Sequence, residues 1–231
     1  MVMAEATNHY FKHLGVSDGL SQVCIPSIYQ DELGAVWLGT TEGLNRYNGK
    51  DVKVFQPSES NHGLTNNEIN ELCGDKNGRM YIRSGNDLIK LDIYTEQFTC
   101  LRQKGVYGLF CKKDTLWVSC ADGIYYYTGQ GTELTFFARV QKGFVGRALY
   151  VDKETVWVVT RKYLVAISRE DPLRQEILLT LDKGNCILGD SSGNIWVGAW
   201  NGLYRISPNR ETTAYVSHSG MGELSDNQVR C

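Results

Sequence analysis

The sequence has almost no net charge and no long apolar segment. Its 231 residues include 24 lysines and arginines against 26 aspartates and glutamates, which gives a formal charge of −2. Electrostatic binding to nucleic acids or anionic membranes normally requires a basic excess, so we expect this segment to bind no nucleic acid. No apolar run approaches the roughly 18 residues of a membrane-spanning helix, and the first residues lack the pattern of a signal peptide.

Motifs for catalysis, nucleotide binding and metal binding are also missing. The chain has neither a GxxxxGK[ST] phosphate loop nor a GxSxG nucleophile elbow. Its seven cysteines form no CxxC pair, and they are not grouped with the four histidines at metal-ligand spacing. Paired carboxylates such as Glu170 and Asp171 fall in turns, where solvation explains them. We therefore predict no catalytic residue, no metal site and no cofactor.

What the sequence does contain is a repeat of about 40 residues. In each unit an aromatic anchor is followed seven positions later by an apolar residue, as Trp37 is followed by Leu44. Unrelated strands would not keep one aromatic residue in step with its surroundings, so the period indicates an array of similar units. The five anchors are Trp37, Tyr81, Trp117, Trp157 and Trp196.

Each unit has the pattern of four short antiparallel strands. The first strand ends at an Asp-x-x-Gly turn such as Asp31 to Gly34, where the carboxylate can bond its own backbone and glycine accepts a positive φ. The anchor strand, a tight turn and two further strands follow. One such sheet cannot bury both apolar faces, so the units must stack. Radial stacking with the anchors between neighbours predicts an all-β, β-propeller fold.

A β-sandwich or a linear β-solenoid is the alternative architecture, but neither explains an aromatic residue at this period. We expect a propeller segment of about five four-stranded blades over residues 1–231. Residues 9–14 predict an orphan outer strand, and residues 224–231 predict the start of a sixth blade. Both ends together predict the amino-terminal part of a larger propeller. The five blades are expected at residues 20–57, 64–103, 106–140, 144–182 and 185–219.

The turn after the anchor strand differs between units. Because each of these turns has the same place in its blade, all of them lie on one rim, and unlike residues on a shared scaffold are how repeat proteins form a binding surface. Trp200 offers a flat face for a sugar or for a side chain of a partner protein, although capping of a neighbouring blade would also explain it. Arginines can hold carboxylates or hydroxyls, and ordinary ion pairing is the alternative. The predicted ligand-binding residues are Trp200, Asn201, Arg161 and Arg83.

Two units carry a more specific pattern. Its residues are Asp31, Gly34, Trp37, Gly39, Thr40, Gly43, Leu44 and Tyr47 in the first unit and Asp190, Gly193, Trp196, Gly198, Gly202, Leu203 and Tyr204 in the fifth. This pattern resembles the two-component regulator propeller repeat of the periplasmic sensor regions of hybrid two-component systems. The second unit departs from it at Tyr81 and Arg83, and the fourth departs at Val159 and Tyr163.

The resemblance implies a periplasmic, ligand-sensing propeller of a hybrid sensor histidine kinase that responds to oligosaccharides and controls glycan-utilisation genes. It also implies a homodimeric parent protein that alone provides the contact with the membrane, and a segment that is not itself an enzyme. Two alternatives stay open, namely a propeller scaffold for protein–protein interaction and a propeller-fold, glycan-degrading enzyme. The distance between carboxylates on different blades, which such an enzyme would need, cannot be read from sequence.

Overall fold

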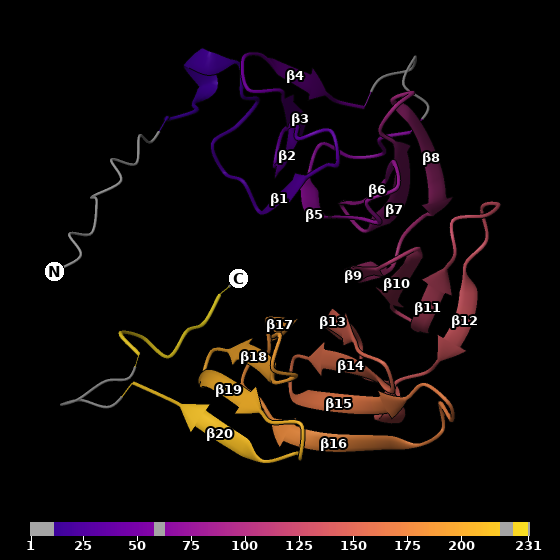
Figure 1. The fold of residues 1–231 in the computed structure, drawn as a ribbon, viewed down its shortest axis with the longest axis vertical. Helices are drawn as coiled ribbons and strands as arrows, with labels where there is room; N and C mark the ends of the chain where they lie inside the picture. The colour runs from indigo at the N-terminus through magenta and orange to yellow at the C-terminus, as the bar shows by residue number, and fades with distance from the viewer. Residues whose placement is uncertain (1–11, 58–62, 218–223, 231) are drawn as a thin grey trace, which may run out of the picture.

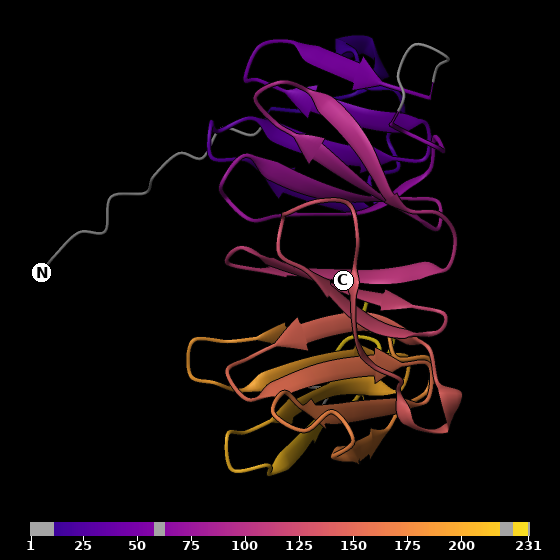
Figure 2. The same cartoon turned by 90° about the vertical axis from the view of Figure 1, so that its right-hand side faces the viewer.

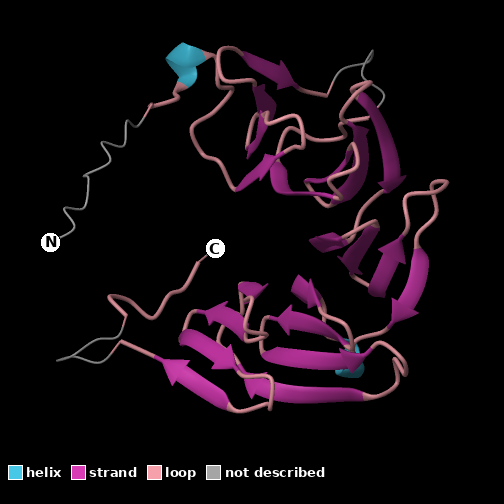
Figure 3. Cartoon of the chain, in the orientation of Figure 1, coloured by secondary structure: helices cyan, strands magenta, loops and turns pink. Residues whose placement is uncertain are grey.

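The computed structural model describes residues 12–57, 63–217 and 224–230. Within these residues, twenty strands form five four-stranded antiparallel sheets, and the helical content is limited to the short 3-10 turns η1 (Val16–Asp18) and η2 (Gln141–Gly143) (Figure 3). Each sheet is made of four strands that are consecutive in the chain. We call these sheets blades 1 to 5 in chain order.

The strands of every blade follow one another from the inner to the outer edge. Blade 1 contains β1 (Ser27–Gln30), β2 (Val36–Thr40), β3 (Gly43–Tyr47) and β4 (Val52–Phe55); blade 2 contains β5 (Ile69–Gly74), β6 (Arg79–Ser84), β7 (Asp87–Asp92) and β8 (Gln97–Arg102); blade 3 contains β9 (Val106–Lys112), β10 (Thr115–Cys120), β11 (Gly123–Tyr127) and β12 (Thr135–Ala138); blade 4 contains β13 (Gly146–Val151), β14 (Thr155–Thr160), β15 (Tyr163–Ser168) and β16 (Gln175–Thr180); blade 5 contains β17 (Cys186–Gly189), β18 (Ile195–Ala199), β19 (Gly202–Ile206) and β20 (Thr212–Tyr215).

The blades are arranged around a common centre. In Figure 1 the first strand of each blade lies nearest that centre and the fourth strand lies outermost. Figure 2, turned by 90°, shows the sheets facing one another in succession. Neighbouring inner strands pack against each other, as β9 does against β13. The predicted all-β propeller is confirmed, and its radial arrangement excludes the β-sandwich and the linear solenoid.

The aromatic anchors lie where the repeat places them, in the second strand of each blade. Four of them fill the space between their own blade and the next. Trp37 packs with Ile69 and Ile82 of blade 2, and Trp157 packs with Val197 of blade 5. Tyr81 and Trp117 occupy the two intervening junctions in the same way. Four apolar clusters between five blades therefore hold the stack together, and they leave the turns free to vary.

The sequence also predicts a structural element at each end of the chain. Of the outer strand expected at residues 9–14, residues 9–11 lie outside the described residues, and residues 12–14 are loop. Residues 224–230 contain no strand, and residue 231 is not described. The backbone N of Val229 donates to the O of Ala199 at 3.0 Å, and its side chain lies against Gly198. Ile69 lies against Gly39 in the same way. Val229 and Ile69 have the same position in the repeat, so this similar packing is expected.

No helix in the described part of the chain is long and apolar enough to cross a membrane.

Candidate functional site

Three inner strands carry an extra residue near their start. In β13, Gly146 pairs with Thr160 and Ala148 pairs with Val159, so the residue between them has no partner on β14. The same register shift occurs in β5 and β9, whereas β1 and β17 pair without one. Such a β-bulge breaks the alternation of side chains and redirects one of them. The residues skipped in this way are Asn70, Tyr107 and Arg147.

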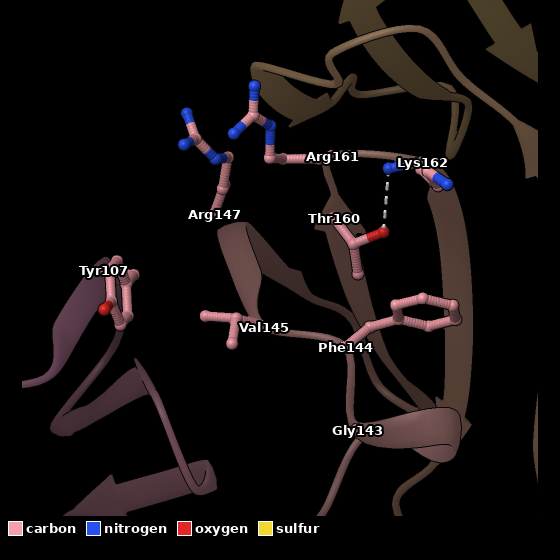
Figure 4. A pocket seen from close by; sticks show the side chains of 8 residues that line it. All are labelled: Tyr107, Gly143, Phe144, Val145, Arg147, Thr160, Arg161 and Lys162. Atoms are coloured by element: carbon pink, nitrogen blue, oxygen red, sulfur yellow. Dashed lines mark hydrogen bonds between the residues drawn. The ribbon is translucent and has the colours of Figure 1, made fainter.

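A hollow of about 360 Å³ lies between blades 3 and 4 (Figure 4). Phe144 and Val145 give it an apolar wall, and the Phe144 ring lies 4.9 Å from that of Tyr163. Tyr107 faces this wall from blade 3. Arg147 and Arg161 also line the hollow, and Figure 4 shows both side chains extending on the side away from Gly143. The hollow therefore combines apolar surface with two cations.

A second hollow, of about 600 Å³, adjoins the first and shares Tyr107 and Arg147 with it. Its other walls are mainly polar, because Arg83 and the carboxylate of Glu68 stand among several asparagine amides. The lining asparagines are Asn66, Asn70, Asn86 and Asn185. We call the surface formed by the two hollows the mouth. Its residues come from the three bulges, the turns after β6 and β14, and the connections that enter blades 2, 4 and 5.

The charges at the mouth differ in their partners. Arg83 Nε donates to Oε2 of Glu71 at 3.3 Å, and its Nη1 donates to the O of Gly85 at 3.4 Å. Within the described residues, the guanidinium groups of Arg147 and Arg161 have neither a hydrogen-bond nor an ion-pair partner. Burial raises the pKa of Glu71 to about 7, and the Arg83 guanidinium keeps that pKa from rising further. The residues that line the mouth include the cations Arg83, Arg147, Arg161 and Lys162 and one carboxylate, Glu68, so the mouth is net positive.

A local contact fixes the turn that presents Arg161. The hydroxyl Oγ1 of Thr160 accepts hydrogen bonds from the backbone N of Lys162 at 3.2 Å and from the N of Tyr163 at 2.8 Å. Oγ1 donates in turn to the O of Tyr163 at 3.0 Å. These bonds close the tight turn between β14 and β15, with the Arg161 side chain projecting from its first residue.

The structure brings together only two of the four residues predicted from sequence. Arg83 and Arg161 line the mouth, one in each hollow. Trp200 and Asn201 line neither hollow. The N of Trp200 donates to the O of Asp182 at 2.8 Å, and the N of Asp182 donates to Oδ1 of Asn201 at 3.1 Å. Both residues hold the connection between blades 4 and 5, which favours the capping alternative.

Sequence reasoning missed Asn70, Tyr107 and Arg147, because it followed the turns rather than the inner strands. The feature that accompanies the bulges is strand length, which only the structure shows. The three bulged strands have six, seven and six residues, whereas β1 and β17 have four.

Comparison with known proteins relates the chain to bacterial signalling proteins. Residues 19–42 match the family model described as "Two component regulator propeller". A stretch of 53 residues is 40% identical to "Histidine kinase P4" of Formosa agariphila, and it covers 23% of this chain and 4% of that kinase. The chain therefore carries a two-component regulator propeller repeat.

Solved structures extend the likeness to nearly the whole chain, but at the level of the fold alone. The extracellular domain of a protein described as a hybrid two component system from B. thetaiotaomicron has a TM-score of 0.77 at 23% identity, over 94% of this chain and 33% of that domain. The present chain thus spans about a third of that domain. Streptogramin B lyase, an enzyme, has a TM-score of 0.65 at 17% identity, over 85% of this chain and 70% of the lyase. The fold by itself accommodates both classes of protein.

Proposed function

We propose that this chain, with its two-component regulator propeller repeat, is a ligand-sensing propeller in the periplasmic sensor region of a hybrid sensor histidine kinase. The repeat at residues 19–42, the kinase that shares 40% identity over 53 residues and the fold of the extracellular domain all support this assignment. The observation that carries it is the mouth. Three inner strands depart from regular pairing, and the three residues that are left without a cross-strand partner line the same hollow.

The ligand that fits the mouth best is an oligosaccharide. Tyr107 is 37% exposed and stands between the two hollows, so its ring can stack on the apolar face of a sugar. The asparagine amides and Arg83 supply donors and acceptors for hydroxyl groups. Ligand binding in a homodimeric parent would then shift an equilibrium between two signalling states and control genes for glycan use.

Titration of the purified chain with a panel of oligosaccharides, by calorimetry, tests this function. We expect saturable binding without any cleavage product, and we expect Tyr107→Ala to weaken it by roughly tenfold, since stacking contributes on the order of 1 kcal/mol. Tyr94→Ala is the matched control, because Tyr94 is exposed at the turn between β7 and β8, at the other end of blade 2.

The alternatives give different outcomes in the same experiment. Chain-dependent cleavage of a glycan would assign the protein to the glycan-degrading enzymes. Capture of a protein partner without affinity for any oligosaccharide would identify an interaction scaffold. Either result would contradict the sensor proposal.

A further inference from the structure

We infer that the mouth receives an anionic group of the ligand, a carboxylate or a sulfate, between Arg147 and Arg161. The inference rests on the proposed ligand-sensing function and specifies the chemical class of the ligand. Arg147 is the bulge residue of β13, and Arg161 follows the last residue of β14. A bulge and a tight turn, two different backbone features, therefore bring two cations to one hollow (Figure 4).

Several other arginines of the described residues are paired with carboxylates. Five of them form an ion pair. The ion pairs of this kind are Arg46–Glu96, Arg79–Asp75, Arg83–Glu71, Arg102–Asp122 and Arg210–Glu176. Arg147 and Arg161 have no such partner within the described residues, and no acidic residue lines their hollow.

Two positive charges that line one hollow repel each other, and the repulsion grows where apolar groups displace water. Phe144, Val145 and Tyr107 provide such surroundings in this hollow. A bound oxyanion would remove the repulsion and could accept paired hydrogen bonds from each planar guanidinium. Lys162, which lines the same hollow, adds a third positive charge. The ligand class that combines an apolar ring face with an oxyanion is an acidic sugar, either a uronic acid or a sulfate ester.

The test compares affinities of the full chain for three probes of equal length: an oligogalacturonide, a sulfated oligosaccharide and a neutral oligosaccharide. Inorganic sulfate serves as a fourth probe. The variant is R147Q/R161Q. The control is R174Q, because Arg174 is also exposed but precedes β16 at the other end of blade 4. Equal melting temperatures establish that each variant is folded.

We expect at least one acidic probe to bind tenfold or more tightly than the neutral one. The double variant should lose roughly 10- to 100-fold in affinity for that probe, since hydrogen bonds to charged groups are individually strong. R174Q should change nothing. The two acidic probes distinguish a carboxylate ligand from a sulfate ligand.

Failure of this inference and failure of the proposed function give separate results. Equal affinity for acidic and neutral probes, or full acidic affinity in R147Q/R161Q, overturns the anion site and leaves ligand sensing intact. Inorganic sulfate that binds at the two arginines, without affinity for any oligosaccharide, supports the anion site and contradicts the proposed function.

A second observation, independent of the mouth, concerns two thiols at the junction of blades 2 and 3. The thiol of Cys73 on β5 donates to Sγ of Cys111 on β9 at 3.3 Å, across 38 positions of sequence. Two other junctions have a different pair in the equivalent place. The Tyr29 ring lies against Gly74, and the Tyr150 ring lies against Gly189. Each of these is a large side chain facing a small one, whereas the thiol pair has two side chains of equal size.

We propose that Cys73 and Cys111 form an oxidisable pair that links blades 2 and 3 covalently when a small-molecule disulfide is present. The two thiols lose two protons and two electrons to form one S–S bond, and the S–S bond of the oxidant breaks to give two thiols. A link between inner strands of neighbouring blades would restrain the two blades that carry Asn70 and Tyr107.

Treatment of the full chain with oxidised glutathione, followed by peptide mapping, tests the pair. We expect a peptide linked through residues 73 and 111, and a melting temperature raised by about 5–10 °C. Cys73→Ser should abolish both changes, whereas Cys100→Ser on β8 should not. Mixed disulfides with glutathione at the two positions, or two unmodified thiols, would overturn the proposal.

Discussion

The indole Nε1 of Trp37 donates a hydrogen bond to Oδ2 of Asp31 at 2.8 Å. The other oxygen of this buried carboxylate, Oδ1, accepts bonds from the backbone N of Ala35 at 2.9 Å and the N of Leu33 at 3.0 Å. One side chain therefore closes the turn between β1 and β2 and orients the anchor that packs on blade 2. The bond recurs from Trp157 to Asp152 at 2.6 Å and from Trp196 to Asp190 at 2.9 Å.

Blade 2 shows what replaces this bond when the anchor is not a tryptophan. The Tyr81 hydroxyl has no hydrogen-bond partner, and Nε of Arg79 donates to Oδ2 of Asp75 instead. Asp75 therefore still accepts a hydrogen bond from a side chain, although its blade has diverged from the repeat.

We predict that Asp31→Ala lowers the free energy of unfolding by about 2–4 kcal/mol, because it leaves the indole N–H and two backbone N–H groups without their acceptor. Urea denaturation measures the change. Asp51→Ala is the control, since Asp51 is exposed in the loop before β4 and its carboxylate has no partner within the described residues. A loss below about 0.5 kcal/mol would show that the carboxylate does not hold the turn.

Asp190 should make stability depend on pH in the acid range. Hydrogen bonds from Trp196 and Asn194 lower the pKa of Asp190 from 3.8 to about 2. A carboxyl with a lowered pKa in the folded state contributes stability above its unfolded pKa and loses that contribution as the pH falls through the folded pKa. We expect Asp190→Asn to be less stable than the wild type at pH 5 and to approach it by pH 2. Parallel unfolding curves across this range would contradict the assignment.

The contact between Tyr150 and Gly189 predicts intolerance to any side chain at position 189. A Cβ there would clash with Cζ of Tyr150, so Gly189→Ala should cost about 1–3 kcal/mol through overpacking. Thermal unfolding measures this, and adding Tyr150→Leu should recover part of the loss. Gly15→Ala is the control, because an added Cβ there meets nothing closer than 3.8 Å. Full additivity of the two changes would argue against direct contact.

Substitution of Trp200 distinguishes a role in ligand binding from a role in capping the neighbouring blade. The ammonium Nζ of Lys183 lies 3.4 Å from the centroid of its ring, within the connection to blade 5. We expect Trp200→Ala to lower the free energy of unfolding by about 1–2 kcal/mol, through loss of this cation–π contact and of buried ring area. Oligosaccharide affinity should stay within about twofold. A tenfold loss of affinity in a protein of unchanged stability would instead place the residue in the ligand site.

The sequence predicts the propeller because the packing between blades is periodic. Trp37 and Trp196 must meet the same requirement in successive units, so their spacing is visible without the structure. The positions of Arg83 and Arg161 also follow, since a turn after the second strand lies at one end of every blade. Arg147 is different. A bulge depends on how two strands align with each other, and neither strand alone encodes that alignment.

The bulges also affect which substitutions the scaffold tolerates. A residue in a regular inner strand is constrained by its cross-strand neighbours and by the adjacent blade, so a change there alters folding. Asn70, Tyr107 and Arg147 have no such cross-strand neighbour. Substitutions at these three positions should therefore alter the lining of the mouth at less cost to the scaffold than substitutions in a regular inner strand.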